Sequence, residues 1–139
     1  MRLRIAVALV LLSTAPCACK TEKDEAVRAE AGRVTRQIEL LRGAANAAKA
    51  PYLNALEQTA CAAPDVCQLR QVCVDAYTLQ EKALASVASV RKAAEQTGSD
   101  VPEGASLVLS EAEAELARAK GMAGQCADLE GAVERKYSL

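Results

Sequence analysis

Cysteines and acidic side chains are the groups in this chain that could carry chemistry. The 139 residues include six cysteines and 18 Asp and Glu residues, but no histidine. Without histidine there is no ready general base near neutral pH, and neither a Ser/His nor a Cys/His nucleophilic pair can form. The composition therefore excludes hydrolases of those kinds and predicts that the protein is not an enzyme.

The densest acidic run lies at Glu111, Glu113 and Glu115. On a helix, a spacing of two residues turns successive side chains about 200° apart, so these carboxylates do not converge on one point. A solvated helix face is the favoured interpretation, ahead of a general acid/base pair. The chain also lacks the combination of a strand and a glycine-rich loop that cradles phosphate, and no cofactor is predicted.

Three of the cysteines, Cys61, Cys67 and Cys73, recur at intervals of six. Zinc sites usually present cysteine pairs about two to four residues apart, and a step of six turns helical side chains about 240° apart. The spacing therefore disfavours a metal site. Together with Cys126, these cysteines form an even set of four that could instead close two disulfides.

The first 18 residues have the three parts of an export signal. Arg2 and Arg4 supply positive charge, residues 5–12 are an unbroken apolar run, and a short stretch of small and polar residues follows. The apolar run is shorter than the roughly 20 residues that span a bilayer. We therefore expect residues 1–18 to be a signal peptide and residues 19–139 to form a single α-helical domain.

The end of this signal resembles that of a bacterial lipoprotein, in which a cysteine becomes the acylated first residue. Ala18 matches the small residue that precedes such a cysteine, and this identifies Cys19 as the lipidation site. Pro16 and Cys17 depart from the usual residues upstream. The resemblance implies an anchor of palmitate-type acyl chains. In the lipoproteins of enteric bacteria, aspartate after the cysteine is a mark of retention in the inner membrane. Lys20 stands at this position, so the resemblance implies the outer membrane, with the protein facing the periplasm. Modification of Cys17, or secretion without a lipid, are the alternatives.

The net charge of the mature chain indicates which partners it can bind. Removing Arg2 and Arg4 leaves 15 Lys and Arg against 18 Asp and Glu, a net charge of −3 spread in both signs along the mature chain. This mild acidity argues against a nucleic-acid partner, because phosphates call for a basic patch.

Disulfides persist in exported proteins, which favours two structural disulfides over a metal site at the four cysteines.

The composition predicts an all-α fold, because the chain contains thirty alanines but only three tyrosines and no phenylalanine or tryptophan. Apolar residues recur at alternating steps of four and three from Val27 to Ala55, which predicts a coiled-coil-like seam. Pro51 lies inside this seam, and a kink or a restart of the helix is expected near Lys49. An antiparallel three-helix bundle is the simplest arrangement. Its predicted helices cover about 22–60, with a kink near 49–51, then 65–96 and 106–136.

Antiparallel packing of the second and third predicted helices selects a disulfide pairing. A turn near residue 101 places Cys73 opposite roughly residue 130, one helical turn from Cys126. Cys73–Cys126 is therefore the predicted bridge between these helices, and Cys61–Cys67 is the predicted staple at the preceding corner. Each closure typically stabilises a fold by about 2–4 kcal/mol, which matters because alanines bury little apolar area.

These features predict a lipid-anchored protein of the bacterial cell envelope that acts as a non-catalytic binding or scaffold module. Its expected partners are the membrane, through the anchor, and another envelope protein. Leu40, Leu53 and Leu56 lie outside the main apolar stripe, where they either dock a partner helix or widen the stripe that faces the core. A soluble secreted helical effector or inhibitor is the alternative function.

Overall fold

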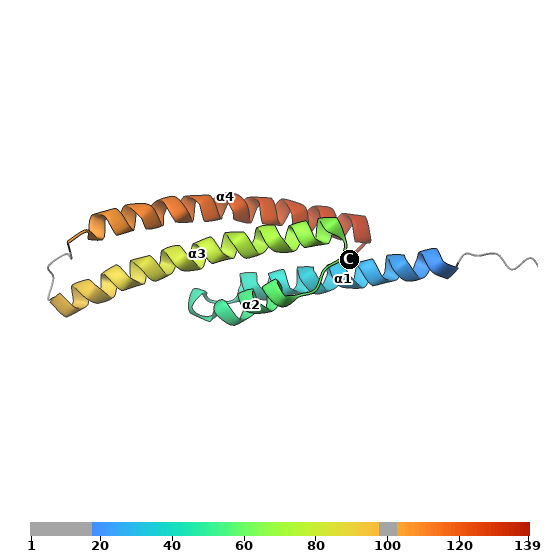
Figure 1. Ribbon diagram of the computed structural model, residues 1–139, viewed down its shortest axis with the longest axis horizontal. Coiled ribbons are helices and arrows are strands. Elements are labelled where there is room, and N and C mark those ends of the chain that lie inside the picture. The colour runs from blue at the N-terminus through green and yellow to red at the C-terminus, as the bar shows by residue number, and fades with distance from the viewer. Residues whose placement is uncertain (1–17, 98–102) are drawn as a thin grey trace, which may run out of the picture.

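The computed structural model describes residues 18–97 and 103–139, and every regular element in these two ranges is helical. Four α-helices and one short 3₁₀-helix follow one another along the chain (Figure 1). Their bounds are α1 Ala18–Gly43, η1 Asn46–Ala48, α2 Ala50–Gln58, α3 Pro64–Thr97 and α4 Ala105–Tyr137. The all-α prediction is confirmed, and α3 and α4 begin and end within one residue of the predicted helices.

The two longest helices, α3 and α4, form an antiparallel hairpin that makes the most extensive contact in the molecule (Figure 1). Buried small residues recur along α4 at every seventh position, a spacing that keeps one side of a helix toward its partner. The buried heptad positions of α4 are Ala105, Ala112, Ala119, Cys126 and Val133. This series runs almost the whole length of the helix.

The disulfide Cys73–Cys126 joins the two helices with a Cα–Cα distance of 5.0 Å. In an antiparallel pair this link sets the register, so moving seven residues along α3 is matched by moving seven back along α4. Val66 then lies opposite Val133, and both side chains are buried in the same core cluster. Because the repeat of α4 is mainly alanine, the helices approach closely but each layer buries little apolar area.

The helices α1 and α2 cover only one half of this hairpin, the half that contains the disulfides (Figure 1). The largest fully buried side chains lie there, and those of α1 come from Val34, Ile38 and Leu41. Beyond the turn between α1 and α2, the hairpin continues as two helices alone. We call residues 81–97 of α3 and 105–118 of α4 the distal hairpin.

The predicted single helix over 22–60 with a kink is wrong, whereas the alternative, a restart near Lys49, agrees with the start of α2 at Ala50. In the structure α1 begins at Ala18 and ends at Gly43, and α2 runs back alongside it (Figure 1). Pro51 stands in the first turn of α2, where its missing N–H leaves no backbone bond unmade. The Lys49 Nζ donates to the carbonyl oxygen of Leu41 at 2.8 Å and so satisfies the end of α1. The interruption is therefore a chain reversal, and four helices replace the predicted three.

The reversal also changes which face of α2 is buried. The predicted seam continued through Tyr52 and Ala55, but both are exposed. Leu53 and Leu56 point into the core instead, with exposures of 7% and 0%. These two leucines therefore belong to the core and do not dock a partner, whereas Leu40 remains 40% exposed.

The close packing of α3 on α4 can be tested at a heptad alanine. We expect Ala112→Leu to lower the free energy of unfolding by about 1–3 kcal/mol, because the larger side chain must push the helices apart. Ala112 is 1% exposed, whereas Ala114 on the same helix is exposed and serves as the matched control. Urea unfolding measures both variants, and equal stability of Ala112→Leu and Ala114→Leu would contradict close packing.

Candidate functional site

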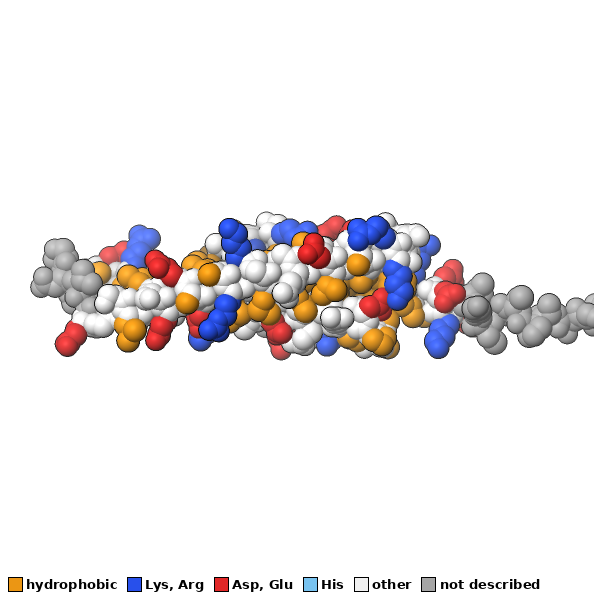
Figure 2. Space-filling model, turned by 90° about the horizontal axis from the view of Figure 1, so that it is seen from above, with side chains coloured by type: hydrophobic (Ala, Val, Ile, Leu, Met, Phe, Trp, Pro, Cys, Tyr) orange, Lys and Arg blue, Asp and Glu red, His pale blue; other side chains and the backbone are white. Residues whose placement is uncertain are grey.

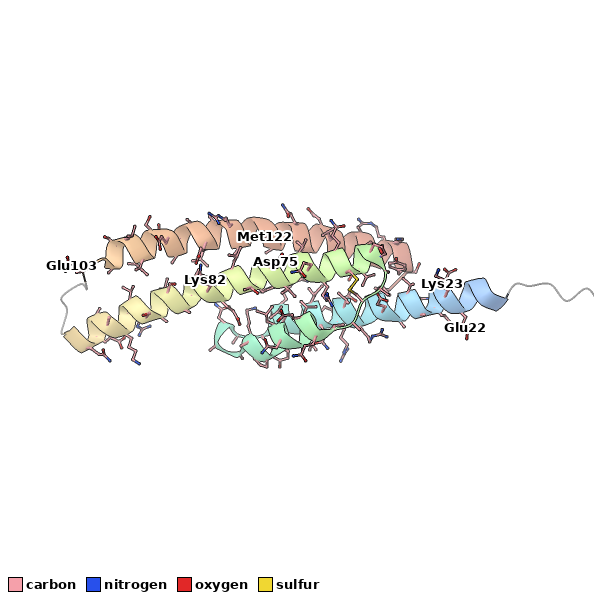
Figure 3. The ribbon with its side chains drawn as sticks, in the orientation of Figure 1. Glu22, Lys23, Asp75, Lys82, Glu103 and Met122 are labelled. Atoms are coloured by element: carbon pink, nitrogen blue, oxygen red, sulfur yellow. A yellow bond between two sulfur atoms is a disulfide. The ribbon has the colours of Figure 1, made fainter. Side chains whose placement is uncertain are left out.

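The predicted lipidation site stands at the start of α1. Cys19 belongs to the first turn of this helix, and its side chain is not among those described. Residues 1–17, including the alternative Cys17, lie outside the described residues. The first turns of α1 project beyond the ends of α3 and α4, and Glu22 and Lys23 are exposed on this projection (Figure 3).

The four remaining cysteines form the two predicted disulfides. Cys73–Cys126 bridges α3 and α4 inside the core, and Cys61–Cys67 closes a ring at the corner where the chain enters α3. They are therefore structural elements of the described fold. Among residues 18–97 and 103–139, no group of three or more potential ligands is arranged to hold a metal ion.

Glu30 of α1 holds this corner through its buried carboxylate. Its Oε1 accepts hydrogen bonds from the backbone N–H groups of Ala62 at 2.7 Å and Ala63 at 2.9 Å. Both donors lie inside the ring closed by Cys61–Cys67. Hydrogen bonds to a charged acceptor are stronger than neutral ones, so this contact ties α1 firmly to the corner.

A second polar contact joins the start of α3 to the end of α4. Asp65 accepts hydrogen bonds from the Lys136 ammonium at 2.7 Å and from the Tyr137 hydroxyl at 3.0 Å. The bond from Lys136, aided by that from Tyr137, lowers the pKa of Asp65 below its usual value of 3.8. The Asp65 carboxylate therefore keeps its charge and its contact with α4 to a lower pH than an isolated aspartate would.

Next to this contact, α1 and the end of α4 border an open hollow of about 670 Å³. The Arg28 guanidinium crosses it and donates to the carbonyl oxygen of Ser138 at 2.6 Å. The side chains around the hollow carry both signs of charge, and its lining residues are Asp24, Glu25, Arg28, Lys136, Tyr137 and Ser138. Because its main cations already bind Ser138 and Asp65, the hollow does not present a free cationic site.

The third polar contact lies at the other end of α1. Arg42 forms an ion pair with Glu130 of α4, whose side chain is only 7% exposed. The hydrogen bond with Glu130 raises the pKa of Arg42 above its usual value. Nearby, the buried Lys49 ammonium lies 5.0 Å from the centre of the Tyr77 ring, a cation–π distance. The Glu130 Oε1 itself is buried without a hydrogen-bond partner among the described residues.

Sequence reasoning missed Glu30, Lys49 and Glu130 as positioning residues. The sequence does mark Glu130 as a buried charge, because it stands four residues after Cys126 and three before Val133, on the apolar stripe of α4. A charge at such a position must find a partner or remain uncompensated. The acidic run at 111–115 was expected to form a solvated face and not a site, and Glu111 and Glu113 are exposed, while Glu115 pairs with Lys82 of α3.

Apolar side chains are exposed on the distal hairpin. Leu107 is 64% exposed, and Val87 and Val108 are each 37% exposed. Leu107 and Val108 border a shallow hollow of about 350 Å³ together with Val90 and Ala93 of α3. Charged side chains of both signs are scattered over the face that carries α4, without a region of one sign (Figure 2). Three of the six exposed large hydrophobic side chains in the described residues therefore lie on the distal hairpin.

Comparisons with protein-family models, curated proteins and solved structures find no match for this chain. In the part of the chain that the structure describes, no helix combines the length and apolar character needed to cross a membrane. A proposal about function therefore rests on the sequence and on the arrangement of the described residues.

The Arg42–Glu130 ion pair can be tested by removing one partner or both. Arg42→Met should lower the free energy of unfolding by about 2 kcal/mol, because the Glu130 carboxylate then stays buried without its cation. The double variant Arg42→Met, Glu130→Met should recover most of this loss, since no charge is left unpaired. Denaturant unfolding measures both, and a double variant less stable than Arg42→Met would contradict the explanation. The exposed pair Arg91–Glu95 provides the control, with an expected loss of less than about 1 kcal/mol.

Proposed function

We propose that the protein is a lipid-anchored component of a bacterial cell envelope that binds a protein partner without catalysis. The observation that carries the proposal is the division of the molecule into two ends. The start of α1, which contains Cys19, lies at one end, whereas the distal hairpin forms the other end (Figure 1). Leu107, Val87 and Val108 are exposed on the distal hairpin. A protein held at its first residue would present the second end to its surroundings.

The anchor is proposed at Cys19, in the outer membrane with the domain in the periplasm. Support comes from the charged, apolar and small-residue parts of residues 1–18, from Ala18 before the cysteine, and from Lys20 after it. A single acyl chain holds a protein only marginally, and the two or three chains that such lipoproteins carry provide stable attachment.

The length of the hairpin supports its use as a spacer. A 34-residue helix such as α3 is about 50 Å long at 1.5 Å per residue, so the distal hairpin stands well away from the anchored end. The lack of histidine supports a non-catalytic role for the distal hairpin.

An amphipathic helix of another envelope protein is the proposed partner. The helices α1 and α2 pack on one face of the α3–α4 hairpin. This face continues, without helices on it, past the turn between α1 and α2. A hollow of about 440 Å³ marks this continuation, and Leu84, Ala85 and Ala88 of α3 line it beside Ala47 and Ala50. A helix laid along the distal hairpin would extend the same kind of packing. Secretion without a lipid, as an effector or inhibitor, is the alternative.

The anchor is tested by Cys19→Ser, with Cys17→Ser as the matched control. We expect Cys19→Ser to move the protein from the membrane fraction to the soluble fraction, because the acyl chains are lost. Cys17→Ser should remain in the membrane fraction. Cell fractionation and intact mass, read together, locate the protein and its acyl group. Release by Cys17→Ser alone would assign the lipid to Cys17, and a soluble, unacylated wild-type protein would support secretion.

The partner surface is tested by placing a photo-crosslinking side chain in cells at Ala88, which is exposed and lines the hollow on the continued face, with Leu40 of α1 as the exposed control position. We expect an adduct with a second protein at Ala88 and none at Leu40. The adduct should be lost when Ala85→Glu is added, because a charge beside Ala88 disfavours apolar packing. An adduct with twice the mass of the chain would indicate self-association and contradict a separate partner. Equal adducts at both positions would contradict a specific surface.

A further inference from the structure

The two disulfides differ in their accessibility to a thiol reagent. Cys73 and Cys126 are 0% and 2% exposed, because they lie between α3 and α4 in the core. Cys61 and Cys67 are both partly exposed, at the corner between α2 and α3. Thiol–disulfide exchange requires a thiolate to reach one of the sulfur atoms, so a reductant meets the corner disulfide first.

The two disulfides also close rings of very different size. The cysteines of the corner pair are six residues apart in sequence, whereas those of the core pair are 53 apart. A short ring removes less conformational entropy from the unfolded chain than a long one. Opening the corner ring is therefore expected to cost less stability than opening the core disulfide.

The corner ring presents the two backbone donors that hold α1. The N–H groups of Ala62 and Ala63 both point to the Glu30 Oε1, and the Glu30 residue is only 8% exposed. On the C-terminal side of Glu30, α1 is held by fully buried Ala31, Val34, Ile38 and Leu41. On its N-terminal side, residues 22–26 are exposed and Arg28 reaches Ser138. Glu30 is thus the last buried contact before the exposed beginning of α1.

We propose that the Cys61–Cys67 disulfide is a redox-sensitive lock on the N-terminal part of α1. A small dithiol is the reductant: one thiolate attacks a corner sulfur and forms a mixed disulfide, and the second thiol then releases the oxidised dithiol. Two electrons and two protons pass to the protein, and Cys61 and Cys67 become free thiols. The backbone at Ala62 and Ala63 gains freedom, its two N–H groups leave Glu30, and α1 loosens from its first residues up to Glu30. The inference depends on the fold alone and not on the lipid anchor.

The test follows the full-length purified protein in detergent through a titration with dithiothreitol. Alkylation and peptide mass mapping report which cysteines are free at each step, and hydrogen exchange reports the amides of α1. We expect Cys61 and Cys67 to be alkylated while Cys73–Cys126 remains intact. In that state amide exchange over residues 27–32 should rise about tenfold, the ratio expected for the loss of charge-assisted hydrogen bonds, with exchange in the middle of α3 unchanged.

Two sets of variants make the test specific. Glu30→Ala should exchange rapidly at residues 27–32 before reduction and respond no further to it, whereas Glu39→Ala, at an exposed position of α1, should respond as the wild type does. The double variant Cys61→Ser, Cys67→Ser should reproduce the reduced state without dithiothreitol. The proposal is overturned if both disulfides are reduced together, if exchange in α1 is the same in both redox states, or if Glu30→Ala responds as strongly as the wild type.

Discussion

The close antiparallel packing of α3 on α4 is the constraint on which the rest of the structure depends. Small residues at every seventh position of α4 allow the approach, and Cys73–Cys126 holds its register. Alanine layers gain little from burial, so the pair needs its length and its covalent link to be stable. The other helices then pack on a surface whose geometry α3 and α4 have already set.

Three polar contacts position α1: one reaches α4, one reaches the corner before α3, and one joins the end of α1 to the start of α2. Glu30 accepts two N–H groups at the corner, Lys49 satisfies the last carbonyl groups of α1, and Arg42 neutralises Glu130. Buried polar groups have few alternative partners, and so they specify position more narrowly than apolar packing does. The core leucines hold α1 and α2 against α3 and α4, and these contacts fix where along α3 and α4 they lie.

Local pattern predicted α3, α4 and both disulfides, because amphipathic period and antiparallel geometry relate residues through simple counting. The same pattern failed between Gly43 and Ala50, since a proline is compatible both with a kinked helix and with the first turn of a new one. The burial of Leu53 and Leu56 depends on that choice and could not be predicted before it. At the candidate site, Glu130 could have been recognised from the sequence because it interrupts the apolar stripe of α4. The N–H donors for Glu30 could not, because they come from a corner that lies near α1 only in the folded chain.

The projecting start of α1 bears on electrostatics at a membrane surface. Residues 19–27 span about 13 Å as a helix, whereas charges in physiological salt are screened over about 8 Å. With Cys19 held at a bilayer, Glu22, Lys23 and Asp24 would lie within this distance of the lipid headgroups, whereas the charges of the distal hairpin would lie far beyond it. The surface presented by the far end would therefore be independent of the lipid composition beneath it, and only the start of α1 would respond to the charge of the bilayer.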